Sequence, residues 1–496
     1  LQPMKSFTRR TFLKQTAVAA GSMAFIGGTR SSAKIVGANN RLRIAIAGCN
    51  GRGSTHIKSW LTQPNVEVAY VIDPDQNVLN AAMATVKKTA EGKYPCKGVS
   101  DFRRALEDPN VDAISIATPN HWHSLMTIMG AQAGKHVYVE KPMSHDVAEG
   151  RVAVAAQQKY GVVVQHGTGM RSDANLAGLH EAIQAGKYGR LKIAYGYCCK
   201  ARPAIGFKSL SAPPANLDWN LWRGPAITKY HANLVHYNWH WFWATGNGDM
   251  NNQGTHQLDV ARWSLDPSLT SPVRIMALGG RFKWQDQGET PNTMFAIGEY
   301  ANGQSVFFNV RNVDYPGYLN QVENEYYFED GGKIAQERKG GKTGAALYFP
   351  AGSSTGEKIT ISPGKVTPGG PFGSFAAACR AGKPAMANGD VHAAHYGSVL
   401  GHLMNNSYRL GEKLPFNAKA GRFGDNRDAY DHFMKLHAIM RDGVGVPENG
   451  AEYTVGPWLT FDSKTEQHTG AFKKEANALL KDPNSPGFEI PAANKV

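Results

Sequence analysis

The first third of the chain alternates short apolar runs with amphipathic stretches. The apolar runs cover residues 42–47, 66–73, 111–120, 136–142 and 161–167. Short apolar runs separated by helical patterns are typical of buried strands in a parallel sheet. The pattern therefore predicts a doubly wound Rossmann domain of the α/β class over residues 40–165.

The rest of the chain, residues 166–496, has the pattern of a second domain that mixes strands and helices. Strand-like runs cover residues 191–199, 273–280, 293–310 and 325–337, and Asn302-Gly303 marks a hairpin turn within the third run. Residues 392–411 have the pattern of a helix that can return against the first domain. The segments 338–371 and 481–496 are rich in Gly, Pro and Lys, and we expect loops or tails there.

The beginning of the chain has the features of an export signal. Arg9 and Arg10 precede a mildly apolar run at 17–28, and SSA at 31–33 offers a small-x-small cleavage site. These features are typical of a twin-arginine signal, here over residues 4–33. The apolar run is too short to span a membrane, and no later run reaches the necessary length. We therefore expect a periplasmic protein without an integral membrane segment.

Composition narrows the functional classes. The 496 residues are 42% hydrophobic and 19% charged, as in an ordinary globular protein. The five cysteines lack C-x-x-C spacing, so we expect neither a zinc site nor a disulfide framework. Part of the formal charge of +14 falls in residues 1–33, which hold five basic and no acidic side chains. Basic blocks interleaved with aromatic residues are missing, which argues against nucleic acid as a partner.

The first apolar run leads into a turn of the form G-x-N-x-x-G, in which asparagine replaces the middle glycine of the dinucleotide-binding fingerprint. The cofactor-binding candidates in this turn are Gly48, Asn50, Gly51, Arg52 and Gly53. The next run ends at Asp73, 20 residues after the last glycine, where a carboxylate is expected to bind the adenosine ribose. This carboxylate would repel a 2′-phosphate, so the sequence predicts NAD rather than NADP.

Several of the apolar runs end in residues of chemical interest. Gly48, Asp73, Asn120 and Lys141 all follow such runs. In a doubly wound sheet, ligands bind beyond the carboxyl ends of the strands. The four residues are therefore expected to meet in one crevice.

These motifs together resemble the Gfo/Idh/MocA family, which includes glucose–fructose oxidoreductase and inositol dehydrogenase. The resemblance rests on the glycine-rich turn, Asp73, TPNHWH at 118–123, EKP at 140–142 and GTHQLD at 254–259, and spans roughly residues 40–420. It implies that a domain with a large, mostly antiparallel sheet follows the Rossmann domain. It also implies a homo-oligomer formed through that sheet.

The resemblance further implies roles for individual residues. Lys141 would stabilise a developing alkoxide and help to receive its proton, and His256 would be the acid/base on the substrate side. The residues expected at the nicotinamide end are Thr118, Asn120, His123, Glu140 and Arg171.

Residues 248–263 have the pattern of a loop that runs into a helix. Asn252, His256 and Asp259 are spaced so that they share one helical face. The family often has aspartate at position 252, whereas an amide cannot take a proton but can orient a substrate hydroxyl. Asp249 is therefore a candidate replacement carboxylate and substrate contact. Asp259 is expected to hold the helix against its neighbour.

Residues 230–253 are unusually rich in His and aromatic residues. Aromatic faces suit the C–H faces of sugar rings, so this segment is a candidate carbohydrate wall, with His240 and Trp241 as substrate contacts. The alternative is a buried aromatic strand, in which alternate side chains would point into the core.

The sequence thus predicts an NAD-dependent oxidoreductase that acts on a hydroxyl of a sugar or glycoside, a small-molecule carbohydrate. Export would remove the enzyme from the cytoplasmic NAD pool, so the NAD is expected to be tightly bound. Two alternatives stay open: an NAD-dependent glycoside hydrolase that oxidises, eliminates and re-reduces, and a non-catalytic sugar-binding protein that carries NAD.

Overall fold

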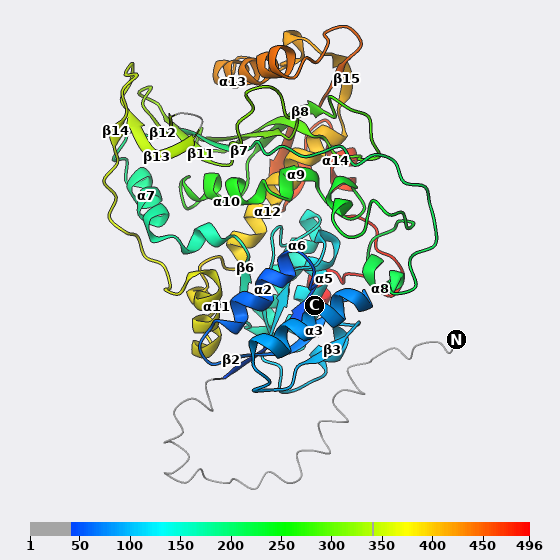
Figure 1. Cartoon of the computed structure of the whole chain (residues 1–496). Helices are drawn as coiled ribbons and strands as arrows, with labels where there is room; N and C mark the ends of the chain where they lie inside the picture. The colour runs from blue at the N-terminus through cyan, green and yellow to red at the C-terminus, as the bar shows by residue number, and fades with distance from the viewer. Residues whose placement is uncertain (1–40, 340–341) are drawn as a thin grey trace. The chain divides into compact units, whose positions relative to one another are not determined.

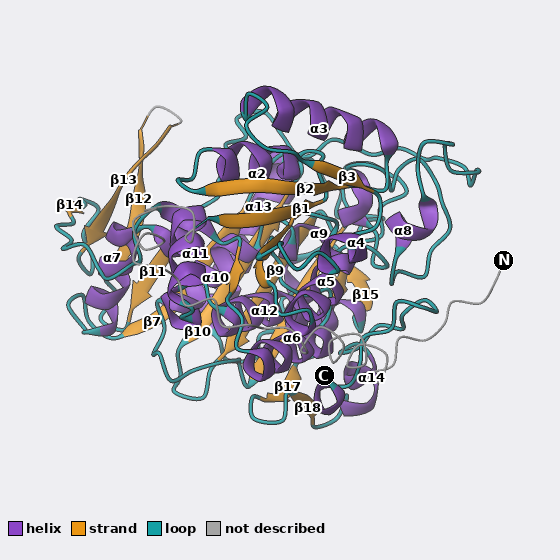
Figure 2. Cartoon of the chain, turned by 90° about the horizontal axis from the view of Figure 1, so that it is seen from below, coloured by secondary structure: helices purple, strands orange, loops and turns teal. Residues whose placement is uncertain are grey.

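Two β-sheets organise the chain in the computed structural model, which describes residues 41–339 and 342–496 (Figures 1 and 2). The expected export signal at 4–33 lies outside the described residues. In the described part, no helix combines the length and the apolar character needed to cross a membrane.

The first sheet is parallel and has six strands in the order β3-β2-β1-β4-β5-β6. Its strands are β1 (Leu42–Ala47), β2 (Val66–Ile72), β3 (Lys97–Val99), β4 (Ala113–Ile116), β5 (His136–Val139) and β6 (Val164–His166). The helices between them are α2 (Arg52–Leu61), α3 (Gln76–Thr89), α4 (Arg103–Leu106), α5 (Asn120–Gln132) and α6 (Val147–Tyr160). This confirms the predicted doubly wound domain. The central strands are mainly apolar because helices cover both faces of the sheet.

The second sheet has twelve strands and is mostly antiparallel, as expected, although β7 and β10 pair in parallel. Its path runs β14-β13-β12-β11-β7-β10-β9-β8-β16-β15, and β17 and β18 attach at β8. Its strands are β7 (Leu191–Cys198), β8 (Arg274–Gly280), β9 (Thr293–Glu299), β10 (Ser305–Arg311), β11 (Asn324–Phe328), β12 (Lys333–Lys339), β13 (Lys342–Phe349), β14 (Glu357–Lys358), β15 (Glu412–Pro415), β16 (Glu452–Val455), β17 (Leu459–Asp462) and β18 (Gln467–Thr469).

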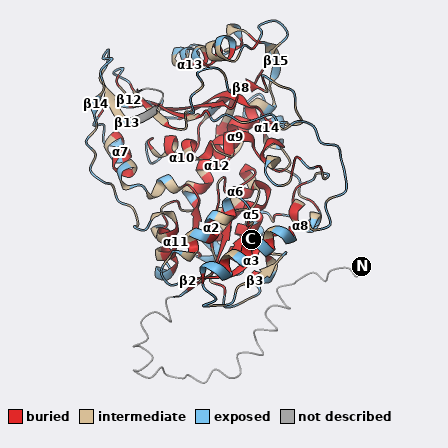
Figure 3. Cartoon of the chain, in the orientation of Figure 1, coloured by how far each residue is buried: buried red, intermediate tan, exposed pale blue. Residues whose placement is uncertain are grey.

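Helices cover the second sheet on both faces, so its central strands are buried throughout (Figure 3). The remaining helices are α7 (Ala174–Gln184), α8 (Trp219–Arg223), α9 (Gly248–Asn251), α10 (Thr255–Trp263), α11 (Gly370–Ala381), α12 (Val391–Arg409), α13 (Arg427–Ala438) and α14 (Lys473–Ala478). Single turns of 3₁₀ or π helix are η4 (Gly169–Ser172), η5 (Asn238–Trp241), η6 (Pro384–Met386), η7 (Ala418–Ala420), η8 (Ile439–Gly443) and η9 (Ala493–Lys495).

Side chains alternate between the two faces along β9 and β10. Ala296 and Phe308 pack against α10 and α12, whereas Phe295 and Phe307 pack against α13 and the segments around it. Figure 1 shows α13 on the opposite side of the sheet from α10 and α12. Each buried phenylalanine contributes about 2 kcal/mol of hydrophobic stabilisation. The chain therefore covers with its own residues much of the outer face through which a homo-oligomer was expected, and that oligomer stays a prediction.

Three segments differ from the local expectations. Residues 230–253 form no strand; they contain the 3₁₀ turn η5 and the short helix α9, joined by loops. Residues 338–371 are not only loops, because they contain β13 and β14. The segment 248–263, predicted as a loop that runs into a helix, forms two helices: Asn252 caps α9, and α10 begins at Thr255, so that His256 lies in its first turn.

Two late segments return to the Rossmann domain. Helix α12 packs beside α6, as predicted for residues 392–411, and Ser398 Oγ on it accepts a hydrogen bond from the backbone N–H of Met143 at 3.0 Å. Residues 481–496 also pack on this domain, because Phe488 and Ile490 are buried in its core.

Candidate active site

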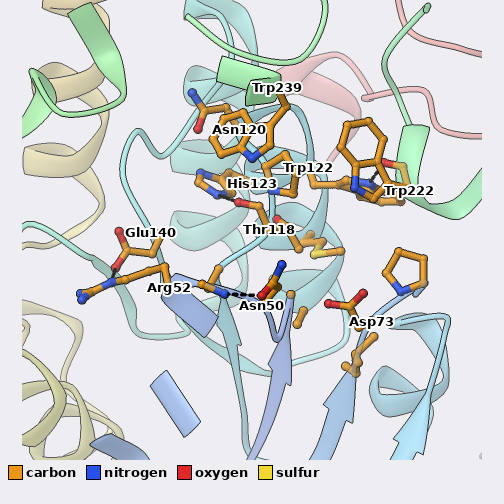
Figure 4. A pocket seen from close by; sticks show the side chains of 18 of the residues that line it. Asn50, Arg52, Asp73, Thr118, Asn120, Trp122, His123, Glu140, Trp222 and Trp239 are labelled. Atoms are coloured by element: carbon orange, nitrogen blue, oxygen red, sulfur yellow. Dashed lines mark hydrogen bonds and ion pairs between the residues drawn. The ribbon is translucent and has the colours of Figure 1, made fainter. Parts of the chain in front are cut away.

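A crevice of about 410 Å³ lies beyond the carboxyl ends of β1, β2, β4 and β5 (Figure 4). It brings together Gly48, Asp73, Asn120 and Lys141, as the strand order predicts. The other predicted site residues that line the crevice are Asn50, Gly51, Arg52, Thr118, His123, Glu140 and Asn252. His236, Tyr237 and Trp239 come from the predicted carbohydrate wall at 230–253, whereas the sequence reasoning did not select other lining residues, among them Pro74, Phe102, Trp122, Leu221 and Trp222.

The glycine-rich turn forms the floor of the crevice. Gly48 has φ +77°, and a Cβ there would lie 2.7 Å from the carbonyl oxygen of Ala117. A Cβ at Gly53 would lie 1.8 Å from the carbonyl oxygen of Gly48. Both glycines are therefore required, because side chains would block the approach of α2 to the end of β1.

Asp73 ends β2 with its carboxylate held in place. Oδ2 accepts a hydrogen bond from the backbone N–H of Cys49 at 2.9 Å, and Oδ1 accepts one from that of Asp75 at 3.0 Å. Burial raises the pKa of Asp73, and these two hydrogen bonds oppose the increase. The carboxylate is thus fixed at the position where the fold binds the adenosine ribose.

Two polar oxygens at the opposite end of the crevice lack partners among the described residues. They are Thr118 Oγ1 and Asn120 Oδ1, both buried. Buried polar atoms of this kind are nearly always satisfied in the working protein, so they suit a polar ligand. His123 lines the same end, but its ring nitrogens face backbone carbonyls, with Nδ1 2.5 Å from Pro142 O and Nε2 2.8 Å from Thr118 O. It therefore shapes the crevice and holds the ends of β4 and β5 together.

Lys141 follows β5 and reaches across the crevice. Its Nζ donates a hydrogen bond to the main-chain carbonyl oxygen of Asn252 at 2.5 Å. Burial lowers the pKa of Lys141, and the charges of Glu140 and Asp249 oppose that decrease. An amine of this kind loses its proton more readily than an exposed lysine does, as a base requires.

Asn252 and Asp249 lie side by side at the end of α9, just before α10. Asn252 Nδ2 donates to Asp249 Oδ1 at 3.1 Å, and Arg202 donates to both oxygens of Asp249 at 2.9 and 3.0 Å. Arg202 lowers the pKa of the buried Asp249 carboxyl against the effect of burial. Asp249 is thus a fully engaged carboxylate that does not line the crevice, and it is not free to replace a proton relay.

His256 lies in the first turn of α10, beside but not within the lining of the crevice. Burial, together with the nearby charge of Lys141, lowers the pKa of His256 to about 4. Its ring makes no hydrogen bond to any residue that the structure describes. His256 is therefore a neutral imidazole at pH 7 with both ring nitrogens available.

Three candidates lie away from the crevice. Arg171 donates to both oxygens of Asp259 at 2.8 Å each and stacks on Trp263, so it holds η4 to α10 rather than a cofactor. Trp241 is buried beneath the Arg281 guanidinium. His240 is buried with Nδ1 2.9 Å from the carbonyl oxygen of Tyr237, and its Nε2 lacks a partner within the described ranges. Their neighbours Tyr237, which is exposed, and Trp239, which is half-buried, form the aromatic wall of the crevice.

Two family models match consecutive parts of the chain. Residues 42–168 match the model described as "Oxidoreductase family, NAD-binding Rossmann fold", and residues 177–332 match "GFO/IDH/MocA C-terminal domain". The chain belongs to the GFO/IDH/MocA oxidoreductase family. Its Rossmann domain is of the NAD-binding type, and the required glycines, the fixed Asp73 carboxylate and the unpartnered oxygens of the crevice fit that ligand.

The relatives of this GFO/IDH/MocA protein include two from Bacillus subtilis (strain 168). The uncharacterized oxidoreductase YrbE is 29% identical over 278 residues, which is 56% of this chain and 69% of the relative. The scyllo-inositol 2-dehydrogenase (NAD(+)) is 30% identical over 154 residues, 30% of this chain and 42% of that protein. Among solved structures, the WlbA dehydrogenase from Bordetella pertussis, in complex with NADH and UDP-GlcNAcA, has a TM-score of 0.51 at 19% identity. That match covers 73% of this chain and 95% of the other.

Residues 216–239 form a roof over the crevice of this oxidoreductase. One end of the roof is held beside Asp73: Gln76 N donates to Asn216 O at 2.9 Å, Asp218 N donates to Pro74 O at 2.9 Å, and His236 Nε2 lies 3.1 Å from Asp75 Oδ2. The other end is held on α5, where the carbonyl oxygen of Trp222 accepts from Trp122 Nε1 at 3.0 Å. The roof thus lies over the dinucleotide site from end to end.

Residues 482–490 form a strap that holds the roof from outside. Ser485 N donates to Pro225 O at 2.9 Å, and its hydroxyl donates to Gly224 O. Phe488 packs edge-on against Trp122, and Asp482 Oδ2 lies 3.2 Å from His145 Nδ1. These contacts hold both the roof, residues 216–239, and the strap, residues 482–490, on the Rossmann domain.

Proposed function

We propose that this protein oxidises a hydroxyl group of a sugar or a related polyol with NAD that remains bound to it. The observation that carries the proposal is the half-buried amine of Lys141, fixed against Asn252 O at the expected nicotinamide end of the crevice. A neutral amine there can take the hydroxyl proton as the adjacent carbon loses hydride. When bound, NAD supplies the hydride acceptor.

The chain's own residues divide the remaining work. The Asn252 carbonyl positions Lys141 Nζ, so that the amine meets a substrate hydroxyl without reorganisation. His256 is neutral and unpartnered among the described residues, so it can exchange a proton with the substrate or with water. Asp249 stays paired with Arg202, which leaves His256 without a carboxylate relay.

The character of the crevice supports a carbohydrate substrate. Tyr237, Trp239 and Trp222 present aromatic surface, and Asn252 lies among polar residues at the reacting end. Flat apolar surface next to hydrogen-bonding groups suits the two kinds of surface on a sugar ring. The inositol dehydrogenase among the relatives acts, by its name, on a polyol of the same chemical class.

Roof and strap support the proposal that NAD is resident rather than exchanging. Release of the dinucleotide requires the roof to break its contacts with Asp75, Gln76 and Trp122. A resident cofactor suits a protein exported in folded form, which the twin-arginine pattern and a periplasmic location would require. We propose that a second substrate, a keto-sugar, restores the cofactor on the enzyme.

The test has two parts. NAD(H) released on denaturing the purified protein is measured first, and about one equivalent per chain is expected. The native protein is then incubated with sugars and simple glycosides, and the products are identified by mass and NMR. A keto-sugar with the aglycone retained supports the proposal. Free aglycone with an intact sugar indicates the redox hydrolase, and sugar binding without any turnover indicates a binding protein, and either result overturns it.

A further inference from the structure

The side chain of Asn50 accepts a hydrogen bond from a backbone N–H of the glycine-rich turn, so that this donor is already used within the protein. Its Oδ1 accepts from the backbone N–H of Gly51 at 2.9 Å, as the dashed line in Figure 4 shows. In the usual fingerprint this position is glycine, and the backbone of the turn approaches the pyrophosphate. This chain therefore offers the cofactor one backbone donor fewer than a turn without a side chain at position 50.

Arg52, two residues later, begins α2 and lines the crevice. Its Nε donates to Glu140 Oε1 at 2.7 Å. Neither of its terminal nitrogens has a partner among residues 41–339 and 342–496, and the side chain is 48% exposed. A guanidinium with two free terminal nitrogens, at the start of a ten-residue helix without acidic residues in its first turn, suits an anion.

Glu140 is a rigid anchor for this arginine. Besides Arg52, its Oε1 lies 3.1 Å from His56 Nε2. His56 Nδ1 lies 2.9 Å from Ser115 Oγ, and that oxygen accepts from Trp60 Nε1 at 2.8 Å. The His56 ring is therefore held between Ser115 and Glu140, with Nε2 facing the carboxylate. His56 and Arg52 hold the pKa of the buried Glu140 carboxyl well below its usual range.

We propose that Arg52, oriented through its Nε by Glu140, is the residue that recognises the pyrophosphate of the dinucleotide and replaces the donor that Asn50 withdraws. The arrangement couples two parts of the site, because the same carboxylate orients Arg52 and precedes Lys141 in the chain. The inference rests on the proposed function only in taking this crevice as the dinucleotide site.

Ligands with and without a pyrophosphate provide the test. Protein freed of its nucleotide is titrated calorimetrically with ADP and with adenosine. Arg52→Gln is expected to weaken ADP binding roughly ten- to a hundredfold, as for the loss of charge-assisted hydrogen bonds, and to leave adenosine binding unchanged. Arg104→Gln, an exposed arginine on α4, serves as the control and is expected to change neither.

Two further variants test the geometry. Glu140→Gln keeps the shape of the anchor but removes its charge, and is expected to weaken ADP binding less than Arg52→Gln does. Asn50→Gly frees the Gly51 N–H and is expected to restore part of the ADP affinity in the Arg52→Gln background. If Arg52→Gln does not fold, Arg52→Lys serves as the test. It keeps the positive charge but loses the two terminal guanidinium nitrogens, and it is expected to weaken ADP binding severalfold.

Equal effects on ADP and adenosine, or no effect on either, would overturn the inference. Failure of Asn50→Gly to restore ADP binding would overturn the compensation by Arg52. Neither ligand takes part in sugar turnover. A protein that shows the expected ADP pattern but oxidises no sugar would therefore keep this inference and lose the proposed function.

Discussion

Lys141 contacts Asn252 through the main chain of the asparagine and not through its side chain (Nζ–O 2.5 Å). The side-chain amide instead holds Asp249. A substitution at position 252 therefore leaves the lysine contact in place and acts on the Asp249–Arg202 pair. The side-chain amide of Asn252 thus has a positioning role toward Asp249.

Asn252→Asp is expected to destabilise the protein at neutral pH. Its carboxylate would face Asp249 in place of a donor, and losing that hydrogen bond costs about 1–3 kcal/mol. The pKa of the new carboxyl is raised in the folded state, so the deficit is absent below about pH 4 and appears as the pH rises through the raised value. Urea unfolding at pH 4 and pH 8 measures it, with Gln253→Glu as a control of equal charge. Unchanged stability together with faster oxidation would instead support a proton relay.

Lys141→Ala is expected to lower the rate of substrate oxidation by about 10²–10⁴-fold, because the base is lost, while NADH stays bound. The wild-type rate should rise with pH, since the neutral amine is the active form. The rise should be centred below the ordinary lysine value of 10.5, because burial lowers the pKa of Lys141. Rate profiles and NADH fluorescence measure both effects, and Lys88→Ala on the exposed face of α3 is the control. A rise centred above 10.5 would contradict the assignment.

Arg171→Ala tests the structural role of a residue that resemblance placed on the cofactor. Removing it leaves the buried Asp259 carboxylate unpaired, which costs about 3–5 kcal/mol. Denaturant unfolding should show that loss, while the folded fraction keeps its NADH affinity. A large loss of NADH affinity without a loss of stability would restore the cofactor role.

Phe488→Ala tests the strap. The side chain is buried against Trp122, so its removal should cost about 3 kcal/mol and loosen the roof. Bound NAD(H) should then be lost more completely on dialysis than from the wild type. Phe472→Ala removes an exposed phenylalanine and is the matched control. Equal retention in both variants would show that the strap does not hold the cofactor.

The strap should also weaken at alkaline pH. Burial raises the pKa of Glu149 to about 8, and Asp482 helps to raise that of His145 to about 9 against the effect of burial. Both folded pKa values lie above the unfolded ones, so these groups stabilise fully at low pH and lose that contribution as the pH rises through 8 to 9. The other charged or titratable groups around them are Asp146, His121, His402 and Arg409.

Thermal unfolding of Glu149→Gln measures this dependence. The variant cannot ionise at position 149, so its melting temperature should exceed that of the wild type at pH 8.5, and the difference should shrink at pH 5. A difference of the same size at both values would contradict a titrating Glu149.

Local pattern was sufficient for the Rossmann half of the site. The run 42–47 is β1 from end to end, and Asp73 and Lys141 meet in the crevice because strand order brings the strand ends to one edge. The resemblance supplied the expectation of the second sheet, whose pairing depends on long-range contacts. The strands predicted for residues 191–337 lie in this second sheet, because the alternation of apolar and polar residues and the hairpin turns are local signals in the sequence.

Where the prediction failed, the deciding partners were distant in sequence. Arg171 pairs with Asp259, and Trp241 lies beneath Arg281. No local spacing of residues in the sequence indicates either contact. The His-rich stretch 230–253 has no strand because its backbone follows its contacts with Asp75 and with residues of the loop around 287–290. Residues 481–496 looked like a tail because only a few apolar side chains, among them Phe488, Ile490 and Val496, anchor a stretch that is otherwise polar.

The strap also sets an order of events during synthesis. Residues 42–168 leave the ribosome long before Ser485 and Phe488, so the first domain can fold while its dinucleotide crevice is still open to the surrounding solution. The crevice acquires its lock only when the late residues reach α5. A cofactor that is resident, as proposed, would therefore be loaded in the interval before that closure, when the nucleotide concentration around the nascent chain decides how many molecules are completed with NAD inside.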